Sequence, residues 1–291
     1  MRLYRDFSLK ELTSWGCGGR CLWLASPESP EEAADLIKRE GGTSPLYVLG
    51  GGTNLLVQEG RLEVGVISSS ALRSLKAERT EEGLSVELGS GCTTKELLAF
   101  AIKNSVGGLE FLAGIPGSVG GAVAGNAGAS GIGFGPLVEA AETVEKDGTL
   151  RLWKSSELKW NYRKAPWEQP PLLITRIFLK LRFTNKDNII KNIRHFAELK
   201  KGQPIGAKTA GCVFKNPEGN AAGRLLDLCG CKELTRGAAA VSSHHANFIE
   251  NRGEASSEDI YLLAEQCRQR VLRECGIKLE YEIKFLGSFM A

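Results

Sequence analysis

Two clusters of glycine and other small residues restrict what this chain can build. The first, GGGTN at residues 50–54, directly follows the apolar run 46–49, and the second extends over residues 114–128. Glycine accounts for 35 of the 291 residues, well above the usual share of about 7%. Such segments cost chain entropy and bury little apolar surface, so an ordinary core would not contain them. We therefore expect the longer cluster to present bare backbone to a ligand.

Size, charge and hydropathy exclude several classes of protein. The length suits one large domain or two to three smaller ones. Lys and Arg number 37 against 34 Asp and Glu, and the net charge of +3 argues against a disordered chain or a nucleic-acid partner. No window approaches the apolar length of a membrane span, and residues 1–10 carry charges where a signal peptide would be apolar. We expect a cytoplasmic protein with no membrane insertion.

The spacing of cysteine and histidine argues against a metal site. The eight cysteines include no CxxC pair, and His195, His244 and His245 have no zinc-like spacing. Reduced thiols in a reducing compartment are the simpler interpretation, and we expect no bound metal.

Periodicity predicts alternating helices and strands after an irregular start. The clearest helix covers residues 256–276, because Ser256 and Asp259 have capping-box spacing and an apolar face follows until Gly276. The turn at Asp147 and Gly148 predicts a β-hairpin. Further helices are expected at 30–40, 93–104, 187–200 and 221–228, and strands at 46–49, 55–57, 83–88, 143–146, 149–153, 172–183, 212–214, 246–249 and 278–286.

Neither glycine cluster has the spacing of a dinucleotide-binding Rossmann loop. By itself, the cluster at 50–54 is most simply a tight turn after a strand, although consecutive glycines also let backbone N–H groups converge on an anion. The longer cluster at 114–128 would suit a large flat ligand such as a diphosphate joined to an isoalloxazine ring. Composition alone does not identify that ligand.

Several separated motifs resemble one enzyme family, the UDP-N-acetylenolpyruvoylglucosamine reductases. The FAD-binding part of that family is similar to residues 50–57, 109–121 and 126–128 of this chain. The second half agrees in order at NYR (161–163), AGCVFKNP (210–217), residues 241–251 and LEYEI (279–283). The resemblance covers nearly the whole chain.

The resemblance implies an α+β fold. It consists of two subdomains that bind FAD in the manner of vanillyl-alcohol oxidase, followed by an α/β substrate domain. The expected divisions are 1–70, 71–185 and 186–291, and the final strand returns to the active site. Because the chain passes from residue 163 to the strand at 172 without a long insert, it resembles the shorter, type II form of the family.

The family reaction implies roles for three residues. Hydride passes from NADPH to non-covalently bound FAD and then to C3 of the enolpyruvyl group of a UDP-sugar, and C2 receives a proton. Negative charge builds on the substrate, so a cation and an acid are needed beside it. By motif, Arg163 is the cation, Glu282 its partner acid and Cys212 the proton donor. The family usually has serine at the position of Cys212. A thiol, with an ordinary pKa of about 8.5, releases its proton more readily than a hydroxyl.

The resemblance also implies binding residues for the cofactor and the substrate. His244 stays open as an alternative to His245, and we expect a monomer or weak homodimer. The expected cofactor contacts are Gly50, Gly51, Gly52, Thr53, Asn54, Gly114, Ile115, Pro116, Gly117, Ser118, Gly120, Gly121, Asn126, Ala127 and Gly128. The expected substrate contacts are Tyr162, Lys200, Asn216 and His245.

Two other hypotheses compete with this reading. One is an oxidase or other FAD-dependent oxidoreductase of the same fold, which often attaches its FAD through His or Cys. The other is a non-catalytic FAD-binding protein, in which Arg163 and Glu282 would have no chemical role.

Overall fold

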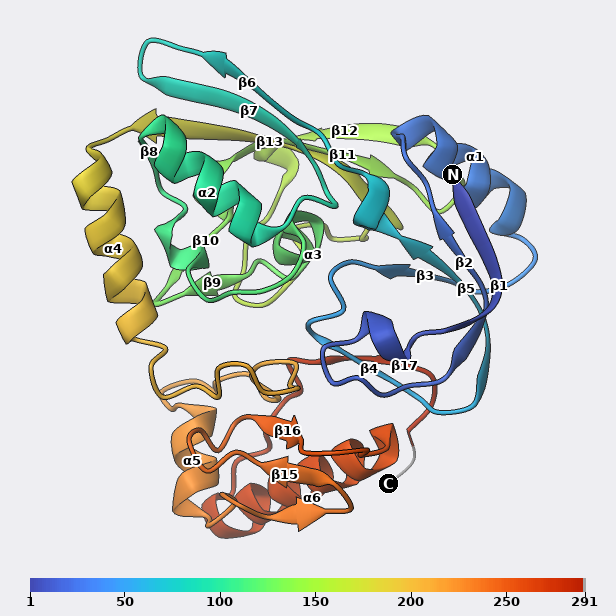
Figure 1. Ribbon diagram of the computed structural model, residues 1–291, viewed down its shortest axis with the longest axis vertical. Coiled ribbons are helices and arrows are strands. Elements are labelled where there is room, and N and C mark those ends of the chain that lie inside the picture. The colour runs from blue at the N-terminus through green and yellow to red at the C-terminus, as the bar shows by residue number, and fades with distance from the viewer. Residues whose placement is uncertain (290–291) are drawn as a thin grey trace. The chain divides into compact units, whose positions relative to one another are not determined.

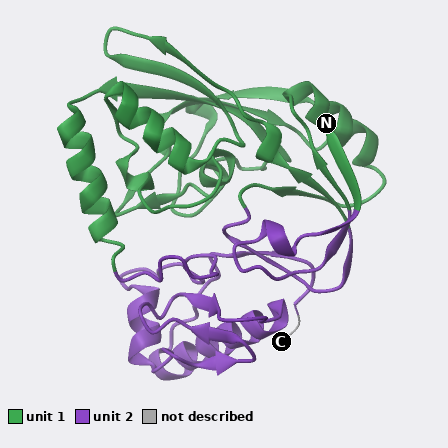
Figure 2. Ribbon diagram, in the orientation of Figure 1, with its two compact units in different colours: residues 1–5, 23–51, 64–201 green, residues 6–22, 52–63, 202–291 purple. Residues whose placement is uncertain are grey.

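A computed structural model of the protein describes residues 1–289, which form two compact units (Figure 2). Unit 1 contains residues 1–5, 23–51 and 64–201, and unit 2 contains residues 6–22, 52–63 and 202 onward. Both units mix helices and strands, in agreement with the α+β expectation. The three-part division at residues 70 and 185 stays a prediction.

A six-stranded antiparallel sheet is the framework of unit 1. Its strand order is β12-β11-β13-β7-β6, and β8 pairs with the end of β13. Along β13 the side chains of Ile177, Leu179 and Leu181 are buried on one face, while Lys180 and Arg182 are exposed. The strands are β6 (Leu75–Arg79), β7 (Gly83–Gly89), β8 (Val106–Gly107), β11 (Val138–Val144), β12 (Leu150–Lys154) and β13 (Leu173–Phe183). The predicted hairpin is confirmed, because β11 and β12 pair on either side of Gly148, whose φ is +82°.

Helices α2 (Thr94–Asn104) and α3 (Val119–Ala124) lie against one face of this sheet (Figure 1). A capping box between Thr93 and Glu96 starts α2, and buried residues of both helices join the same apolar core as β7 and β13. The sequence predicts α2 but not α3, whose six residues are mostly glycine and alanine. Helix α4 (Lys186–Glu198) follows β13.

A second sheet has the strand order β1-β2-β5-β3. The irregular start expected for the chain is wrong, because two of these strands, β1 (Arg2–Ser8) and β2 (Arg20–Ser26), precede the first helix. The others are β3 (Leu46–Leu49) and β5 (Arg61–Ser68), which pair in parallel. Helix α1 (Pro30–Glu40) has the predicted bounds, with the Ser29 side chain accepting a hydrogen bond from the Glu32 N–H. A short hairpin joins β9 (Gly128–Ala129) and β10 (Ile132–Gly133).

Unit 2 packs two helices with a three-stranded sheet of order β14-β15-β16. Helix α6 (Ser257–Cys275) begins with the predicted Ser256–Asp259 capping box and ends at Gly276, whose φ is +69°. Its apolar face is buried as expected. The other elements are α5 (Ala222–Leu228), β14 (Thr235–Arg236), β15 (Ala239–Val241) and β16 (Ile249–Asn251). Over residues 1–289, no helix is both long and apolar enough to cross a membrane.

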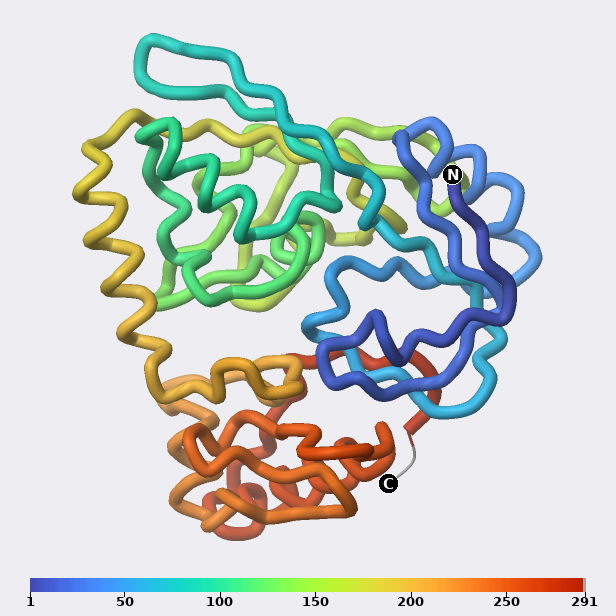
Figure 3. The backbone as a smooth tube through the Cα atoms, in the orientation of Figure 1, coloured from blue at the N-terminus to red at the C-terminus, as the bar shows by residue number. Residues whose placement is uncertain are grey.

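The C-terminal segment runs beside a segment more than two hundred residues earlier. Strands β4 (Leu55–Val57) and β17 (Lys284–Leu286) pair in parallel, and Figure 3 shows the red end of the chain along the blue segment. Four strand predictions need correction, the first being 143–146, because the strand there, β11, covers 138–144. The last strand covers only 284–286 of the expected 278–286, and the strand at 246–249 lies at 249–251. Residues 212–214 form no strand, because only Phe214 makes a β-bridge, to Tyr281.

Candidate functional site

The two glycine clusters meet in unit 1, backbone against backbone. A Cβ on Gly51 would lie 2.7 Å from the Cα of Gly117, and one on Gly50 would lie 2.7 Å from the Ser118 Oγ. Part of the glycine content therefore allows two loops to pack on each other. The predicted cofactor contacts of both clusters stay predictions.

The loop before α3 has a conformation that requires glycine. Gly114 and Gly117 have φ values of +73° and +113°. Ser118 then starts α3, and its side chain accepts a hydrogen bond from the Gly121 N–H at 3.2 Å. The predicted cofactor residues at 114–121 thus form a glycine turn that leads into the capped first turn of α3.

FAD, which the resemblance implies, fits the polar groups beside this turn. Ser90 Oγ and Asn126 Oδ1 are buried and, within residues 1–289, have no hydrogen-bond partner. Asn126 itself has a φ of +41°, and its Nδ2 donates to the Asn161 carbonyl at 2.9 Å. A side-chain-poor surface next to unsatisfied polar oxygens is suited to a flat, polar cofactor.

Three predicted residues of unit 1 converge near that turn. Arg163 adopts a φ of +52° in the turn that Asn161 begins, and its guanidinium carbon lies 5.7 Å from the centre of the Tyr162 ring. Lys200 Nζ donates to the carbonyls of Phe111 and Ala113, directly before Gly114. Burial and the charge of Arg163 lower the pKa of Lys200 to about 8. Unit 1 therefore places two cations beside the predicted cofactor loop.

Unit 2 brings Cys212 and Glu282 onto paired segments of backbone. The Glu282 N–H donates to the Val213 carbonyl at 2.8 Å, and the Lys215 N–H donates to the Glu280 carbonyl at 2.9 Å. These bonds flank the bridge between Phe214 and Tyr281, whose rings stack at 5.1 Å. Two of the three predicted catalytic residues thus come from segments that pair directly, although they are 70 positions apart in the sequence.

Asn247, which the sequence analysis did not identify, holds the Cys212 segment in place. Its Oδ1 accepts from the Phe214 N–H at 2.9 Å, its Nδ2 donates to the Phe214 carbonyl at 2.8 Å, and its own carbonyl accepts from Val213. In effect the side chain replaces the neighbouring strand that this segment lacks. The sequence signal that could have identified Asn247 is a polar residue inside the apolar run ANFI (246–249), because a buried amide needs hydrogen-bond partners.

Asn54, which belongs to unit 2, forms hydrogen bonds with the segment that carries Glu282. Its Nδ2 donates to the Glu282 carbonyl at 3.2 Å, and its own carbonyl accepts from Lys284 at 2.9 Å. Gly52 has a φ of +64° and accepts from the Ser14 N–H, and a Cβ on it would collide with the Leu12 carbonyl. Thr53 lies between these two residues.

The predicted substrate residues Asn216 and His245 both contact the start of α5. Asn216 Oδ1 accepts from the Ala222 N–H at 2.9 Å, and a Cβ on Gly223 would lie 2.8 Å from the His245 ring. Burial lowers the pKa of His245. Its Nδ1 accepts from the Asn247 N–H, so the neutral ring carries its proton on Nε2. His244, the alternative, is exposed.

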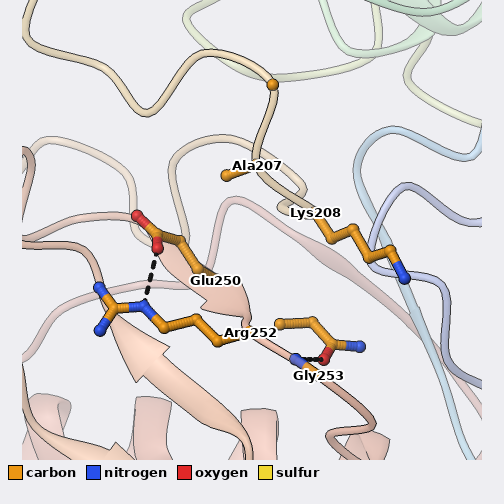
Figure 4. A pocket seen from close by; sticks show the side chains of 7 residues that line it. Ala207, Lys208, Glu250, Arg252 and Gly253 are labelled. Atoms are coloured by element: carbon orange, nitrogen blue, oxygen red, sulfur yellow. Dashed lines mark hydrogen bonds and ion pairs between the residues drawn. The ribbon is translucent and has the colours of Figure 1, made fainter.

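Two pockets in unit 2 contain none of the predicted site residues. One of about 410 Å³ includes Glu250 and Arg252, which form an ion pair at 3.0 Å, while Lys208 points away from them (Figure 4). The other, of about 440 Å³, is lined by aromatic side chains and by Glu265, which accepts from the Tyr281 hydroxyl at 2.6 Å. The hydrogen bond between Tyr281 and Glu265 helps to hold the segment that carries Glu282.

Comparison with known proteins assigns both parts of the chain. Residues 22–152 match the FAD binding domain family, and residues 203–286 match the C-terminal domain family of UDP-N-acetylenolpyruvoylglucosamine reductase. The reductase of Heliobacterium modesticaldum is 35% identical over 280 residues, which cover 95% of this chain and 88% of the relative. The reductase of Gluconobacter oxydans is 36% identical over 271 residues, covering 93% and 87%.

Solved structures agree with these matches. The crystal structure of the reductase from Thermus caldophilus is 36% identical, covers 99% of this chain and 100% of its own, and superposes with a TM-score of 0.83. Wild-type Phl p 4.0202, a glucose dehydrogenase, is 16% identical with a TM-score of 0.50 over 63% of this chain and 42% of its own, a likeness of fold alone. The fold expected from the sequence is confirmed. The chain belongs to the UDP-N-acetylenolpyruvoylglucosamine reductase family.

Proposed function

We propose that Arg163, Cys212 and Glu282 perform the charge and proton chemistry of the family's reaction in this chain. The protein is an FAD-dependent oxidoreductase of peptidoglycan precursor synthesis. It uses NADPH to reduce UDP-N-acetyl-3-O-(1-carboxyvinyl)glucosamine to UDP-N-acetylmuramate. Bound FAD supplies the hydride chemistry, so the side chains have to bind, orient and exchange protons.

The glycine loops are the proposed FAD site. Gly50, Gly51 and the turn at 114–121 offer backbone without side chains, and Asn126 and Ser90 offer polar oxygens. Further polar groups come from Thr53 and Asn54. These groups would hold the cofactor without a covalent bond.

Arg163 and Glu282 are proposed to stabilise the charge that develops on the substrate. When C3 of the enolpyruvyl group receives hydride, negative charge moves onto the enolate that includes the carboxylate. A guanidinium stabilises that charge, and a carboxylic acid on the other side of the enolate donates a hydrogen bond to it. The left-handed backbone at Arg163 supports this role, because such a conformation at a bulky residue is uncommon and often functional.

Cys212 is proposed to protonate C2. The pairing of residues 213–215 with 280–282 is the single observation that carries this assignment, since it fixes the segments of a proton donor and an acid next to each other. A thiol in place of the usual serine keeps an exchangeable proton at this position.

The UDP-sugar is proposed to bind to four side chains, those of Lys200, Tyr162, Asn216 and His245. Below its pKa of about 8, Lys200 carries a charge that suits a diphosphate. We further propose a cytoplasmic monomer or weak homodimer of the type II form, in which no long insert separates Arg163 from β13.

The purified protein tests the assignment directly. It should be yellow, release FAD on acid treatment, and consume NADPH only when the enolpyruvyl substrate is present. NADPH consumption that ignores the substrate and produces peroxide would favour an oxidase of the same fold. A protein that binds FAD but transfers no electrons would favour a non-catalytic role. Arg163→Lys and Glu282→Gln should each slow oxidation of reduced FAD by substrate and leave reduction by NADPH nearly unchanged.

A further inference from the structure

Four cysteines of unit 2 lie on or directly after the helices α5 and α6, which pack against each other. Cys229 is the residue that ends α5, and Cys275 is the last residue of α6. Cys231 and Cys267 form a second, hydrogen-bonded pair close by. None of these residues belongs to the site described above, so their grouping has no explanation in the reaction.

Cys229 and Cys275 are held within reach of a covalent bond. Their sulfur atoms lie 3.5 Å apart, compared with about 2.05 Å in a disulfide. Arg270, on α6, donates to the carbonyls of Cys229 and Gly230 and so fixes the end of α5 against α6. Gly276 terminates α6 directly after Cys275, and a helix end can shift by the remaining distance without disturbing a core.

The two thiols differ in accessibility, which sets the order in which they react. Cys275 is exposed, whereas Cys229 is buried. Desolvation, together with the neighbouring Cys275 and Glu274, raises the pKa of Cys229 to about 12. An oxidant in solution therefore meets Cys275 first, and Cys229 is placed to react second.

The Cys231–Cys267 pair gives a natural comparison. Both residues are almost fully buried, at 0% and 1% exposure. A hydrogen bond to Cys267 lowers the pKa of Cys231, but an oxidant cannot reach either sulfur without opening the core of unit 2. Only one of the two pairs is therefore accessible.

We propose that Cys229 and Cys275 form a modification site at which a peroxide produces a reversible disulfide. The Cys275 thiol releases its proton, the thiolate attacks one peroxide oxygen and the O–O bond breaks. The products are a sulfenic acid and a hydroxide, which takes up the released proton as water. The Cys229 sulfur then attacks the sulfenic sulfur, the S–O bond breaks, and the hydroxide leaves with the proton of Cys229 as a second water. Two thiols lose two electrons and two protons, and the peroxide is reduced to two waters. A dithiol reductant restores both thiols by exchange.

Peptide mapping of the holoenzyme tests the proposal. The protein is treated with hydrogen peroxide, remaining thiols are alkylated, and tryptic peptides are analysed without reduction. Trypsin cleaves after Lys and Arg and so places the four cysteines on three peptides. Peptide 225–232 contains Cys229 and Cys231, peptide 253–268 contains Cys267, and peptide 274–278 contains Cys275. We expect a disulfide between peptides 225–232 and 274–278, fragmentation that places it on Cys229 rather than Cys231, and its loss on treatment with dithiothreitol.

Serine variants and thermal unfolding complete the test. Cys275→Ser and Cys229→Ser should each abolish the linked peptide, and Cys267→Ser should retain it. Because the bond joins residues 46 positions apart, oxidation should raise the thermal midpoint of the wild type but not of Cys275→Ser. A link to peptide 253–268, a disulfide between two molecules through Cys275, or further oxidation of Cys275 while Cys229 stays a thiol would each overturn the proposal.

Discussion

Replacing Asn247 with alanine should separate the placement of Cys212 from the general stability of unit 2. In the paired segments, the Val213 carbonyl and the Lys215 N–H bond to residues 280–282, whereas both backbone groups of Phe214, between them, face the opposite way. The groups that satisfy them are Oδ1 and Nδ2 of Asn247, at 2.9 and 2.8 Å. Alanine removes both partners at once.

The geometry sets the size of the effect. Each buried backbone group left without a partner costs about 1–3 kcal/mol, and water entering the space left by the amide recovers part of it. We therefore expect Asn247→Ala to lower the free energy of unfolding by about 2–4 kcal/mol. The Cys212 segment would also lose its alignment with Glu282, and a misplacement of about 1 Å costs up to about 100-fold in rate.

The assay compares two half-reactions by stopped-flow absorbance and unfolding by urea titration. Asn251→Ala is a matched control, because that buried side chain also bonds only to backbone, at Trp15, Gly253 and Ala255. Both variants should be destabilised, but only Asn247→Ala should slow oxidation of reduced FAD by substrate selectively. Equal slowing of both half-reactions, or the same pattern in Asn251→Ala, would refute the positioning role.

Two further predictions concern substrate and cofactor binding. Lys200 is charged below its pKa of about 8, so KM for the UDP-sugar should rise as the pH increases through that value. In Lys200→Arg this rise should vanish from steady-state profiles, and a rise that persists would contradict the assigned contact. Gly51→Ala places a Cβ 2.7 Å from Gly117, so it should weaken FAD binding in equilibrium dialysis. Gly42→Ala is the control, because a Cβ there meets nothing within 4 Å, and it should leave FAD binding unchanged. An equal loss of FAD affinity in both variants would contradict the loop-packing argument.

Local patterns predicted much of the fold. The bounds of α1 and the capping box of α6 follow from residues within a few positions of one another, and the structure has both as expected. The missed helix α3 has little apolar side chain to show periodicity; its cap at Ser118 and its packing against the sheet stabilise it. Strand β2 was missed because part of its pairing is with β5, beyond α1 and β3 in the sequence, and β1 in turn pairs with β2.

The site was harder to predict than the fold for the same reason. Motif resemblance selected Cys212 and Glu282, but nothing local indicated that their segments pair, because the bonds join residues 213–215 to 280–282. The expected strand at 212–214 failed since a side chain, Asn247, supplies the bonds that a strand would have supplied. Buried polar residues of this kind leave only a weak sequence signal.

The central claim is that the thiol of Cys212 delivers the proton to the substrate, and single-turnover kinetics of Cys212→Ala tests it most directly. The variant, loaded with FAD, is first reduced with NADPH and then mixed with the enolpyruvyl substrate. Reduction should proceed at the wild-type rate, reoxidation by substrate should be almost lost, and Cys212→Ser should retain activity. Reoxidation of Cys212→Ala at the wild-type rate would contradict the claim and remove Cys212 from the mechanism.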